Sequence, residues 1–483
     1  MRITKIMKRI KSSIIVFCWS LCNLVGQNLP KIFSEDPTLS HAQIGILIIN
    51  TNTNDTIEEY GSKTNMTPAS LQKLFTTATV LETYGTDYKI PTYLEYEGQI
   101  KNGVLEGNLF IRGTGDPTLG SRAIYGNNPT NFLYTWIQKV KDAGIQQING
   151  SVIADASFFD EEAINPGWLW EDIGNYYAPG VMALAYMDNT INIVLQSGAV
   201  GSKATILKTY PEYPDIEFIN YIKCTQINYD GAFVHGLPYD NKRFLFGSIP
   251  SKLGSFGIMG DMPNPPLFLA KHFTEALISS GIAVRDSAKY IISNNQKTPR
   301  NPIYTHLSKS LDTIVQEINF SSNNLYAEVL FRRLGENYGT PCSIYNSIAF
   351  MYDYWTTKIR PMQYCVIKDG CGLASKNSVS PETFVQLLRY MEKSKNAEVF
   401  YNSLPTSGEK GTLAGIFTTK ELRGKVHAKS GSFENVRNYA GYIDAPNGDK
   451  WVFAIMISGA KVKQKHLRIK IERYLQDVYQ RNA

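Results

Sequence analysis

The tetrad Ser70-Leu71-Gln72-Lys73 places a hydroxyl and an amine three residues apart. If these residues lie on a helix, the two side chains share one face, so the amine can take the proton of the hydroxyl. A lysine can act as such a base only when burial or a neighbouring cation lowers its pKa. The tetrad therefore predicts a nucleophile, Ser70, and its general base, Lys73.

The same spacing occurs at two other places, so the tetrad alone is a weak signal. Ser407 and Lys410 lie in a glycine-rich loop, and Ser458 and Lys461 lie at the end of a predicted strand. Neither context puts residues i and i+3 on one face. Only the first tetrad follows a predicted strand and a turn, with Pro68 placed to open a helix.

A second pattern, Ser322-Asn323-Asn324, precedes an apolar run with helical spacing. The hydroxyl of Ser322 could relay a proton, and the carboxamide of Asn324 could contact a peptide substrate. Serine and asparagine are also common helix caps, so the pattern taken alone equally fits an ordinary helix N-terminus.

A third pattern, Lys429-Ser430-Gly431-Ser432, precedes a predicted strand. Lys429 could offer a fixed cation to a substrate carboxylate and depress the pKa of a second lysine. The hydroxyl of Ser430 could bind the same carboxylate, and Gly431 would let a substrate backbone approach closely. Judged alone, these residues also fit a solvated turn.

The elements that must position these residues can be predicted from periodicity. Residues 43–49 form an apolar, β-branched run typical of a buried strand, and the spacing from Leu71 to Leu81 predicts a helix. Residues 438–443 and 451–458 predict two strands joined by an Asn-Gly turn. The chain ends in an amphipathic helix whose predicted buried stripe comprises Leu467, Ile471, Leu475 and Val478.

The net charge of +6 over 483 residues comes largely from the first residues of the chain. Five basic residues precede an apolar stretch in residues 1–26, which reads as a secretory signal peptide. Without it the charge is about +1, too small to indicate a nucleic-acid partner. We expect a periplasmic or otherwise extracytoplasmic location, with no integral membrane segment after removal of the signal.

The segment between the predicted catalytic residues differs in composition from the two ends. Residues 93–304 are richer in glycine, asparagine and short alternating strands. We therefore expect a discontinuous domain of residues 28–92 and 305–483, interrupted by an inserted region of two small α/β domains. Four cysteines follow the signal peptide, too few for a disulfide framework. We expect buried free thiols, although Cys365 and Cys371 could form a disulfide in an oxidising compartment.

The order Ser-x-x-Lys, Ser-x-Asn, Lys-Ser-Gly is the signature of β-lactamases and penicillin-binding proteins. The chain resembles the class C low-molecular-mass penicillin-binding proteins, which are D-alanyl-D-alanine carboxypeptidases and endopeptidases. About 250 residues separate the first two motifs, which argues against class A β-lactamases. The resemblance covers nearly the whole mature chain and rests on residues 68–77, 115–119, 167–172, 322–328, 369–373, 404–405, 411–413 and 428–432.

The resemblance implies an α+β fold, with an antiparallel sheet flanked by helices and interrupted by inserted β-rich domains. It implies acylation of Ser70 by peptidoglycan stem peptides, inhibition by β-lactam antibiotics as covalent inhibitors, and no cofactor or metal. Ser322 and Asn324 would complete the proton network and hold the acyl-chain amide. Lys429 and Ser430 would receive the terminal carboxylate. The oxyanion hole would consist of the backbone N–H groups of Ser70 and Ser432.

Three residues depart from the family pattern: Asn323 stands for Asp, Ser430 for Thr, and Cys371 for Ser. The last concerns substrate fit more than catalysis. The scattered histidines do not suggest a metallohydrolase or a Ser-His-Asp hydrolase. The residues leave open a non-catalytic wall-binding protein, a β-lactamase or a transpeptidase on the same fold.

Overall fold

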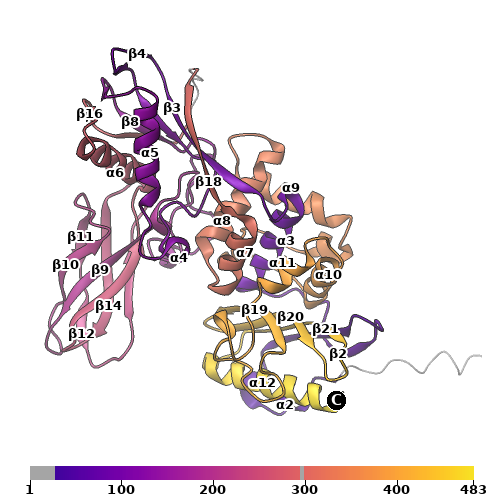
Figure 1. The fold of residues 1–483 in the computed structure, drawn as a ribbon. Coiled ribbons are helices and arrows are strands. Elements are labelled where there is room, and N and C mark those ends of the chain that lie inside the picture. The colour runs from indigo at the N-terminus through magenta and orange to yellow at the C-terminus, as the bar shows by residue number, and fades with distance from the viewer. Residues whose placement is uncertain (1–27, 294–298) are drawn as a thin grey trace, which may run out of the picture.

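The structure is a computed structural model that describes residues 28–293 and 299–483. The predicted signal peptide, residues 1–26, lies outside the described residues. Figure 1 shows helices and a sheet built from both ends of the chain at the lower right, and strand-rich middle segments at the left. Among the described helices, none combines the length and the apolarity needed to cross a bilayer.

A five-stranded antiparallel sheet joins the two ends of the chain. Its strand order is β19-β20-β21-β1-β2, so Ile46 of the first strand lies opposite Ile455 of β21. These strands agree with those predicted at 43–49, 438–443 and 451–458. The bounds are β1 (Gln43–Asn50), β2 (Thr56–Tyr60), β19 (Val426–Phe433), β20 (Val436–Asp444) and β21 (Lys450–Ser458).

Strand β1 packs against a layer on each face of this sheet. Ile46 and Ile48 belong to the hydrophobic cluster that includes the C-terminal helix, while Leu47 and Ile49 belong to the main core on the opposite face. Successive residues of a strand point to opposite faces. A strand covered on both sides is therefore apolar throughout, as predicted for this run.

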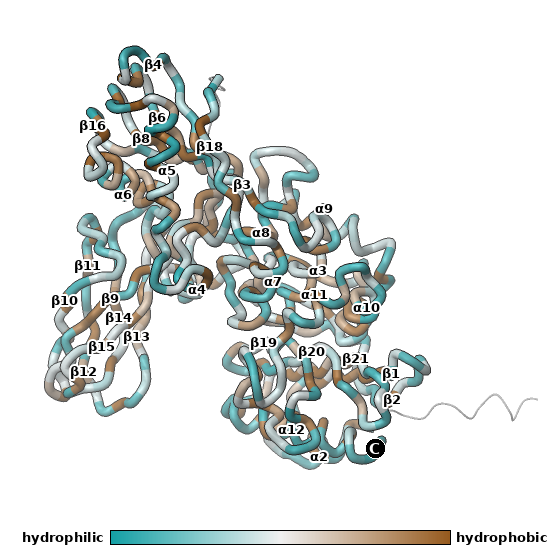
Figure 2. Tube along the Cα trace, viewed as in Figure 1, coloured by the Kyte–Doolittle hydropathy of each residue, from teal (hydrophilic) through white to brown (hydrophobic). Residues whose placement is uncertain are grey.

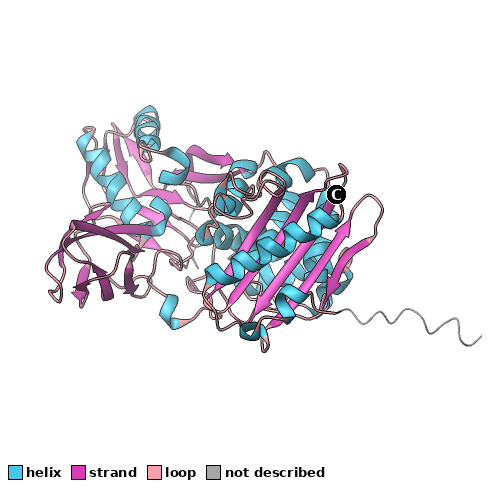
Figure 3. Cartoon of the chain, turned by 90° about the horizontal axis from the view of Figure 1, so that it is seen from below, coloured by secondary structure: helices cyan, strands magenta, loops and turns pink. Residues whose placement is uncertain are grey.

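The C-terminal helix α12 (Gln464–Arg481) crosses the outer face of the sheet, beside α2 (Lys31–Ser34) (Figure 3). Basic residues such as Lys465 and Arg473 lie on its exposed side. The predicted apolar stripe is buried against the sheet and consists of Leu467, Ile471, Leu475 and Val478.

The other face of the sheet carries the main helical layer, with α10 lying directly on β1, β20 and β21. The central helix α3 is buried at every residue from Gln72 to Leu81. It is preceded by a 3₁₀ turn, η2 (Ala69–Leu71). The helices of the layer are α3 (Gln72–Tyr84), α7 (Leu311–Phe320), α8 (Asn324–Leu334), α9 (Ile344–Thr356), α10 (Pro381–Glu392) and α11 (Ala397–Asn402).

The chain leaves the helical layer through β3 (Lys89–Tyr96) and returns through β18 (Asn301–Ser310), which pair antiparallel. The predicted boundaries at 92 and 305 fall inside this strand pair. The pair belongs to a five-stranded sheet, β17-β8-β6-β3-β18, near a second sheet, β16-β7-β5-β4. The other elements of this unit are β4 (Gln99–Lys101), β5 (Val104–Glu106), β6 (Leu109–Arg112), α4 (Arg122–Tyr125), α5 (Asn131–Asp142), β7 (Gln147–Ile148), β8 (Val152–Asp155), α6 (Pro265–Ser279), β16 (Ala283–Val284) and β17 (Lys289–Ile291).

Residues 190–261, all of them described, form a unit in which every regular element is a strand, where the sequence had suggested α/β character. Hydrophilic and hydrophobic residues are mixed along its strands (Figure 2), and the side chains that point inward form a separate core. We call it the β unit. Its strands are β9 (Thr190–Ser197), β10 (Thr205–Tyr210), β11 (Glu217–Asn220), β12 (Lys223–Thr225), β13 (Gly231–His235), β14 (Lys242–Pro250) and β15 (Gly254–Asp261).

Candidate active site

Ser70 and Lys73 meet at the start of the central helix, as the tetrad predicts. Ser70 lies in the 3₁₀ turn η2, and Lys73 is the second residue of α3. Residues i and i+3 eclipse in a 3₁₀ turn, which brings the two side chains together. The Nζ of Lys73 donates a hydrogen bond to the Oγ of Ser70 at 3.1 Å. The predicted nucleophile and base are therefore in contact.

Lys73 has two further hydrogen-bond acceptors. Its Nζ donates to Oδ1 of Asn324 at 2.6 Å and to the carbonyl oxygen of Cys371 at 2.7 Å. The side chain is fully buried, and this burial lowers the pKa of Lys73 despite the opposing effect of nearby acidic groups. A buried amine whose pKa is lowered can be neutral and accept a proton.

The rival tetrads lack this arrangement. The Oγ of Ser407 donates to the carbonyl oxygen of Leu422, and Lys410 is exposed. Ser458 is the last residue of β21, where i and i+3 do not share a face. The predicted preference for Ser70 thus agrees with the local geometry.

Lys429 lies on the edge strand β19, facing the N-terminus of α8. Its Nζ donates to the Oγ of Ser322 at 2.9 Å and to the carbonyl oxygen of Ser430 at 2.8 Å. Lys429 is fully buried, and burial together with the charge of Lys73 lowers its pKa well below the ordinary value. The second and third predicted motifs are therefore brought together although 107 residues separate them.

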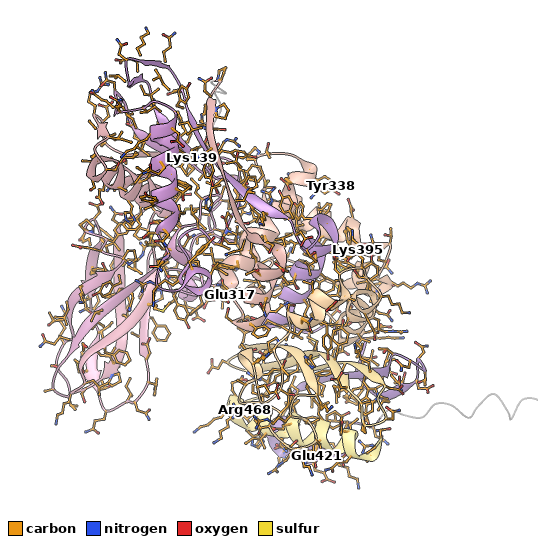
Figure 4. The ribbon with its side chains drawn as sticks, viewed as in Figure 1. Lys139, Glu317, Tyr338, Lys395, Glu421 and Arg468 are labelled. Atoms are coloured by element: carbon orange, nitrogen blue, oxygen red, sulfur yellow. The ribbon has the colours of Figure 1, made fainter. Side chains whose placement is uncertain are left out.

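Ser322 has a φ of +61°, in the left-handed region that serine rarely adopts. Asn323, one of the three departures from the family pattern, caps α8 by accepting a hydrogen bond from the backbone N–H of Tyr326 at 3.1 Å. Glu317, which is labelled in Figure 4, lies in the last turn of α7, the helix that directly precedes this motif. The central side chain of the motif therefore has a structural role, and its neighbours Ser322 and Asn324 contact the two lysines.

Gly431 lies against the turn that carries the nucleophile. A Cβ at this position would stand 2.5 Å from the carbonyl oxygen of Pro68 and 3.2 Å from the backbone nitrogen of Ser70. Only glycine allows β19 to approach this closely. Asn438, opposite Gly431 on β20, strengthens the contact because its Nδ2 donates to the carbonyl oxygens of Thr67 and Pro68 at 2.9 and 3.0 Å.

The hydroxyl groups of the third motif face different surroundings. The Oγ of Ser430 donates to the Oγ1 of Thr412 at 3.3 Å, which adds a second hydroxyl beside Lys429. Ser432 is exposed and lies opposite Arg437 of β20. Because β19 is the edge strand of its sheet, alternate N–H groups along it are not used by sheet pairing.

Two buried carboxyl groups hold the loop that presents the Cys371 carbonyl to Lys73. Oε1 of Glu328 accepts hydrogen bonds from the backbone N–H groups of Gly370 and Cys371 at 2.7 and 2.6 Å. Asp369 accepts bonds from its own loop, from Asn377 and from the indole of Trp168. Glu328 was not identified from the sequence, although it lies one helical turn after Asn324 within an apolar run.

Burial, with a smaller contribution from the charge of Asp369, raises the pKa of Glu328 to about 8. Burial also raises the pKa of the Cys371 thiol well above its usual value. Ligand atoms of Glu328, Asp369 and Cys371 lie within 4.8 Å of one another. The Sγ of Cys371 donates to Oδ2 of Asp369 at 3.5 Å. A buried thiol whose pKa is raised is a poor nucleophile, which argues against that role for Cys371.

The inserted region also reaches the active site. The Nδ2 of Asn324 donates to the carbonyl oxygen of Tyr177 at 2.7 Å. Its carboxamide thus links Lys73 to a loop that precedes the β unit. The sequence segment 167–172 was part of the resemblance, but nothing in it pointed to the backbone of Tyr177.

The four described cysteines are free and buried, as expected. They are Cys224, Cys342, Cys365 and Cys371.

The chain is similar in sequence to two D-alanyl-D-alanine carboxypeptidases. The chain is 25% identical over 463 residues to D-alanyl-D-alanine carboxypeptidase DacB of Haemophilus influenzae, covering 95% of this chain and 94% of that protein. It is 25% identical over 438 residues to the D-alanyl-D-alanine carboxypeptidase of Actinomadura sp. strain R39, covering 88% of this chain and 79% of that protein.

The fold is similar to the crystal structure of penicillin binding protein 4 (dacB) from Haemophilus influenzae. The TM-score is 0.80 at 25% sequence identity, covering 93% of this chain and 98% of that chain. The same protein complexed with a β-lactam gives a TM-score of 0.74 at 24% identity, covering 93% and 100%. The predicted α+β fold with inserted domains is confirmed.

The model of the D-Ala-D-Ala carboxypeptidase 3 (S13) family matches residues 25–478. This match spans nearly the whole chain and includes all three predicted motifs. The predicted resemblance to the class C low-molecular-mass penicillin-binding proteins is confirmed, and the chain belongs to the D-Ala-D-Ala carboxypeptidase 3 (S13) family.

Proposed function

We propose that this serine hydrolase cleaves the bond between the two terminal D-alanines of peptidoglycan stem peptides, with Ser70 as its nucleophile. The observation that carries the proposal is the 3.1 Å contact between the Ser70 hydroxyl and a fully buried lysine amine, Lys73. The second buried lysine, Lys429, lies on the facing strand, where a cation can bind a peptide carboxylate. The family of the chain supports the same reaction.

The reaction follows from these contacts. Neutral Lys73 takes the proton of Ser70, whose Oγ then attacks the carbonyl carbon of the penultimate D-alanine. Collapse of the tetrahedral intermediate breaks the C–N bond, and the leaving amine takes the proton held by Lys73. Water then attacks the acyl-serine ester, Lys73 again takes its proton, and Ser70 recovers it as the acid product leaves.

The negative charge of the intermediate needs donors that are already in place. The backbone N–H groups of Ser70 and Ser432 are our candidates, because β19 approaches the nucleophile's turn at Gly431. Such donors are worth about 3 kcal/mol each in related acyl transfers. The terminal carboxylate of the peptide would lie against Lys429, Ser430 and Thr412. Lys429 contacts only uncharged oxygen atoms, those of the Ser322 hydroxyl and the Ser430 carbonyl, so the substrate carboxylate would be its counter-ion.

The remaining predictions fit this function. Residues 1–26 would direct the enzyme out of the cytoplasm to the periplasm, and β-lactams would acylate Ser70 as substrate analogues. Residues 28–92 and 305–483 would fold as the catalytic domain around residues 93–304. The backbone carbonyl of Tyr177, in the inserted region, accepts a hydrogen bond from Asn324. We therefore expect the inserted region to help position the substrate.

A fluorescent penicillin tests the chemistry directly. The purified protein should become covalently labelled, and the Ser70→Ala variant should not. Equal labelling of the two proteins, or none of the wild type, contradicts the proposal. Labelling that is rapidly lost by hydrolysis would instead identify a β-lactamase.

Two substrates then separate the possible peptidase activities. Release of D-alanine from a stem pentapeptide measures carboxypeptidase activity, and cleavage of a cross-linked muropeptide dimer measures endopeptidase activity. Turnover of either substrate by the wild type, lost in Ser70→Ala, supports the proposal. A labelled protein that turns over neither substrate would be a penicillin-binding protein without peptidase function.

A further inference from the structure

One face of the β unit carries aromatic side chains on its outside. Strands β13 and β14 pair antiparallel, with Phe233 opposite Phe246 and His235 opposite Phe244. Residues directly opposite each other share a side of the sheet, so these four rings lie together. Tyr221, just after β11, stacks on Phe246 with ring centroids 5.3 Å apart and planes inclined by 11°. We call these five residues the aromatic face.

Four of the five rings of the aromatic face are exposed to solvent and His235 is half-buried, although the residues between them along the strands are buried. Tyr221, Phe233 and Phe246 are 56%, 51% and 40% exposed, whereas the intervening Val234 and Leu245 form the core of the β unit. A contiguous exposed patch of large apolar side chains on a soluble protein is commonly a binding surface.

The aromatic face is connected to the active site by one loop. The backbone N–H of Val234 donates to Oδ1 of Asn175 at 3.1 Å, and two residues later the carbonyl of Tyr177 accepts the hydrogen bond from Asn324. Between them, Tyr176 is 50% exposed and its ring packs edge-on against Tyr177. A polymer with its peptide in the active site can follow this loop to the aromatic face.

We propose that the aromatic face binds the glycan strand to which the stem peptide substrate is attached. The flat faces of a sugar ring present C–H groups that pack on aromatic rings, while its hydroxyl and acetamido groups remain solvated. The centre of the aromatic face is apolar. The strand register places Lys242, Glu217 and Lys223 at its borders, where Lys242 pairs with Glu217 at 3.9 Å. An apolar centre with charges only at its rim suits the faces of sugar rings. The choice of this polymer rests on the proposed function.

The area of the aromatic face is too small for a stable dimer. An aromatic side chain presents roughly 150–250 Å², so the exposed parts of these rings amount to about 400 Å². A stable protein interface buries about 800 Å² on each partner. A patch of half that size matches a few sugar rings better than a second copy of the chain.

Peptide-free glycan strands, prepared from peptidoglycan with an amidase, provide the probe. We expect the wild-type protein to bind these strands and the double variant Tyr221→Ala/Phe246→Ala to bind about ten-fold more weakly. Tyr221→Phe keeps the stacked ring and should retain binding. Tyr134→Ala is the matched control, because Tyr134 is 71% exposed on α5 of the inserted region.

Labelling with fluorescent penicillin and hydrolysis of a soluble pentapeptide should be unchanged in the double variant, which also shows that it is folded. The proposal is overturned if the wild type does not bind the strands, or if the double variant binds them equally well. A wild-type dimer in sedimentation velocity that becomes a monomer in the double variant would assign the surface to self-association instead. Glycan binding by a protein that no penicillin labels would contradict only the proposed function.

Discussion

The two sides of the active site differ in how completely their polar groups are paired. On the helical side, the Nζ of Lys73 lies within hydrogen-bond distance of oxygen atoms of Ser70, Asn324 and Cys371. When this amine is neutral, its two N–H groups can donate to Asn324 and Cys371, and its lone pair remains for the Ser70 hydroxyl. On the strand side, Lys429 donates to two acceptors, and one of these is the carbonyl of its own neighbour. The helical side is thus complete before substrate arrives, whereas the strand side gains its anionic partner from the substrate.

This difference separates two contributions to catalysis. Groups that are already oriented lower the barrier without reorganisation during the reaction. Lys429, which lacks a counter-ion, instead gains interaction energy when the substrate carboxylate binds. It therefore also contributes to the specificity for substrates that carry a carboxylate. Substitutions on the two sides should therefore change different kinetic quantities.

The largest effect should follow from Lys73→Met. The variant keeps a side chain of similar volume but removes the base, so kcat for D-alanine release should fall about 10⁴-fold. The substitution leaves Oδ1 of Asn324 and the carbonyl oxygen of Cys371 without this donor, so the unfolding midpoint should stay the same or fall by a small amount. Lys461→Met, in a rival tetrad, is the control for steady-state kinetics and thermal unfolding. A decrease in kcat of less than ten-fold in this variant would exclude Lys73 as the general base.

Lys429→Ala should lower kcat/KM for the pentapeptide about 10³-fold, because a buried charge-assisted contact with the carboxylate is lost. The repulsion between the two lysines is mutual, so removing Lys429 raises the pKa of Lys73. The acid limb of the penicillin acylation rate should then move to higher pH. The exposed Lys425→Ala is the control. A wild-type rate and pH profile in the variant would show that the lysines are not coupled.

Gly431→Ala should reduce acylation about 10²-fold, since a displacement of about 1 Å near the reacting atoms has an effect of this size. The added Cβ would collide with the carbonyl oxygen of Pro68 and push β19 away from the nucleophile. Gly415→Ala, whose Cβ would meet nothing within 4 Å, is the control. Unchanged stopped-flow acylation would mean that the close approach is not needed for the oxyanion donors.

Glu328→Gln should have the smallest effect, a few-fold in kcat, because the amide oxygen can still accept both loop N–H groups.

The raised pKa of Glu328, about 8, means that its protonated form is the stable buried form. Its contribution to stability is complete below pH 4.5 and is lost as pH rises toward 8. The free energy of unfolding, measured in urea, should therefore decrease over this pH range more for the wild type than for the Glu328→Gln variant. Equal pH dependence would contradict the burial of an ionisable carboxyl, and Glu398→Gln, at an exposed residue, is the control.

The pairing of nucleophile and base could be predicted because it is local, whereas the other two acceptors of Lys73 lie 251 and 298 residues away along the chain. The contact between Ser70 and Lys73 spans three residues and follows from backbone periodicity. The contact between Lys429 and Ser322 spans 107 residues, and only the order of the motifs pointed to it. The role of Glu328 could not be predicted, because no local sequence signal distinguishes a buried carboxyl that binds a loop from an exposed carboxyl on the same helix.

The fold shows the same dependence on distance along the chain. The apolar run at 43–49 and the paired strands near the C-terminus were predictable from composition and turns. The strand pair β3–β18 was divided by the predicted boundaries at 92 and 305, because a change in composition does not mark where a continuous strand passes from one unit to another. In the β unit, alternation indicated strands but could not show that they pair only with one another.

The pairing of β1 with β21 has a consequence for how the protein folds. Ile46 and Ile455, directly opposite in the sheet, are separated by about 400 residues of chain. Contacts of such long range form slowly because the intervening loop must be closed first. Strand β1 can pair with β2 early, but its other backbone edge stays unpaired until β21 has been synthesised and the intervening chain brings the two strands together. The active enzyme should therefore accumulate no faster than this sheet is completed.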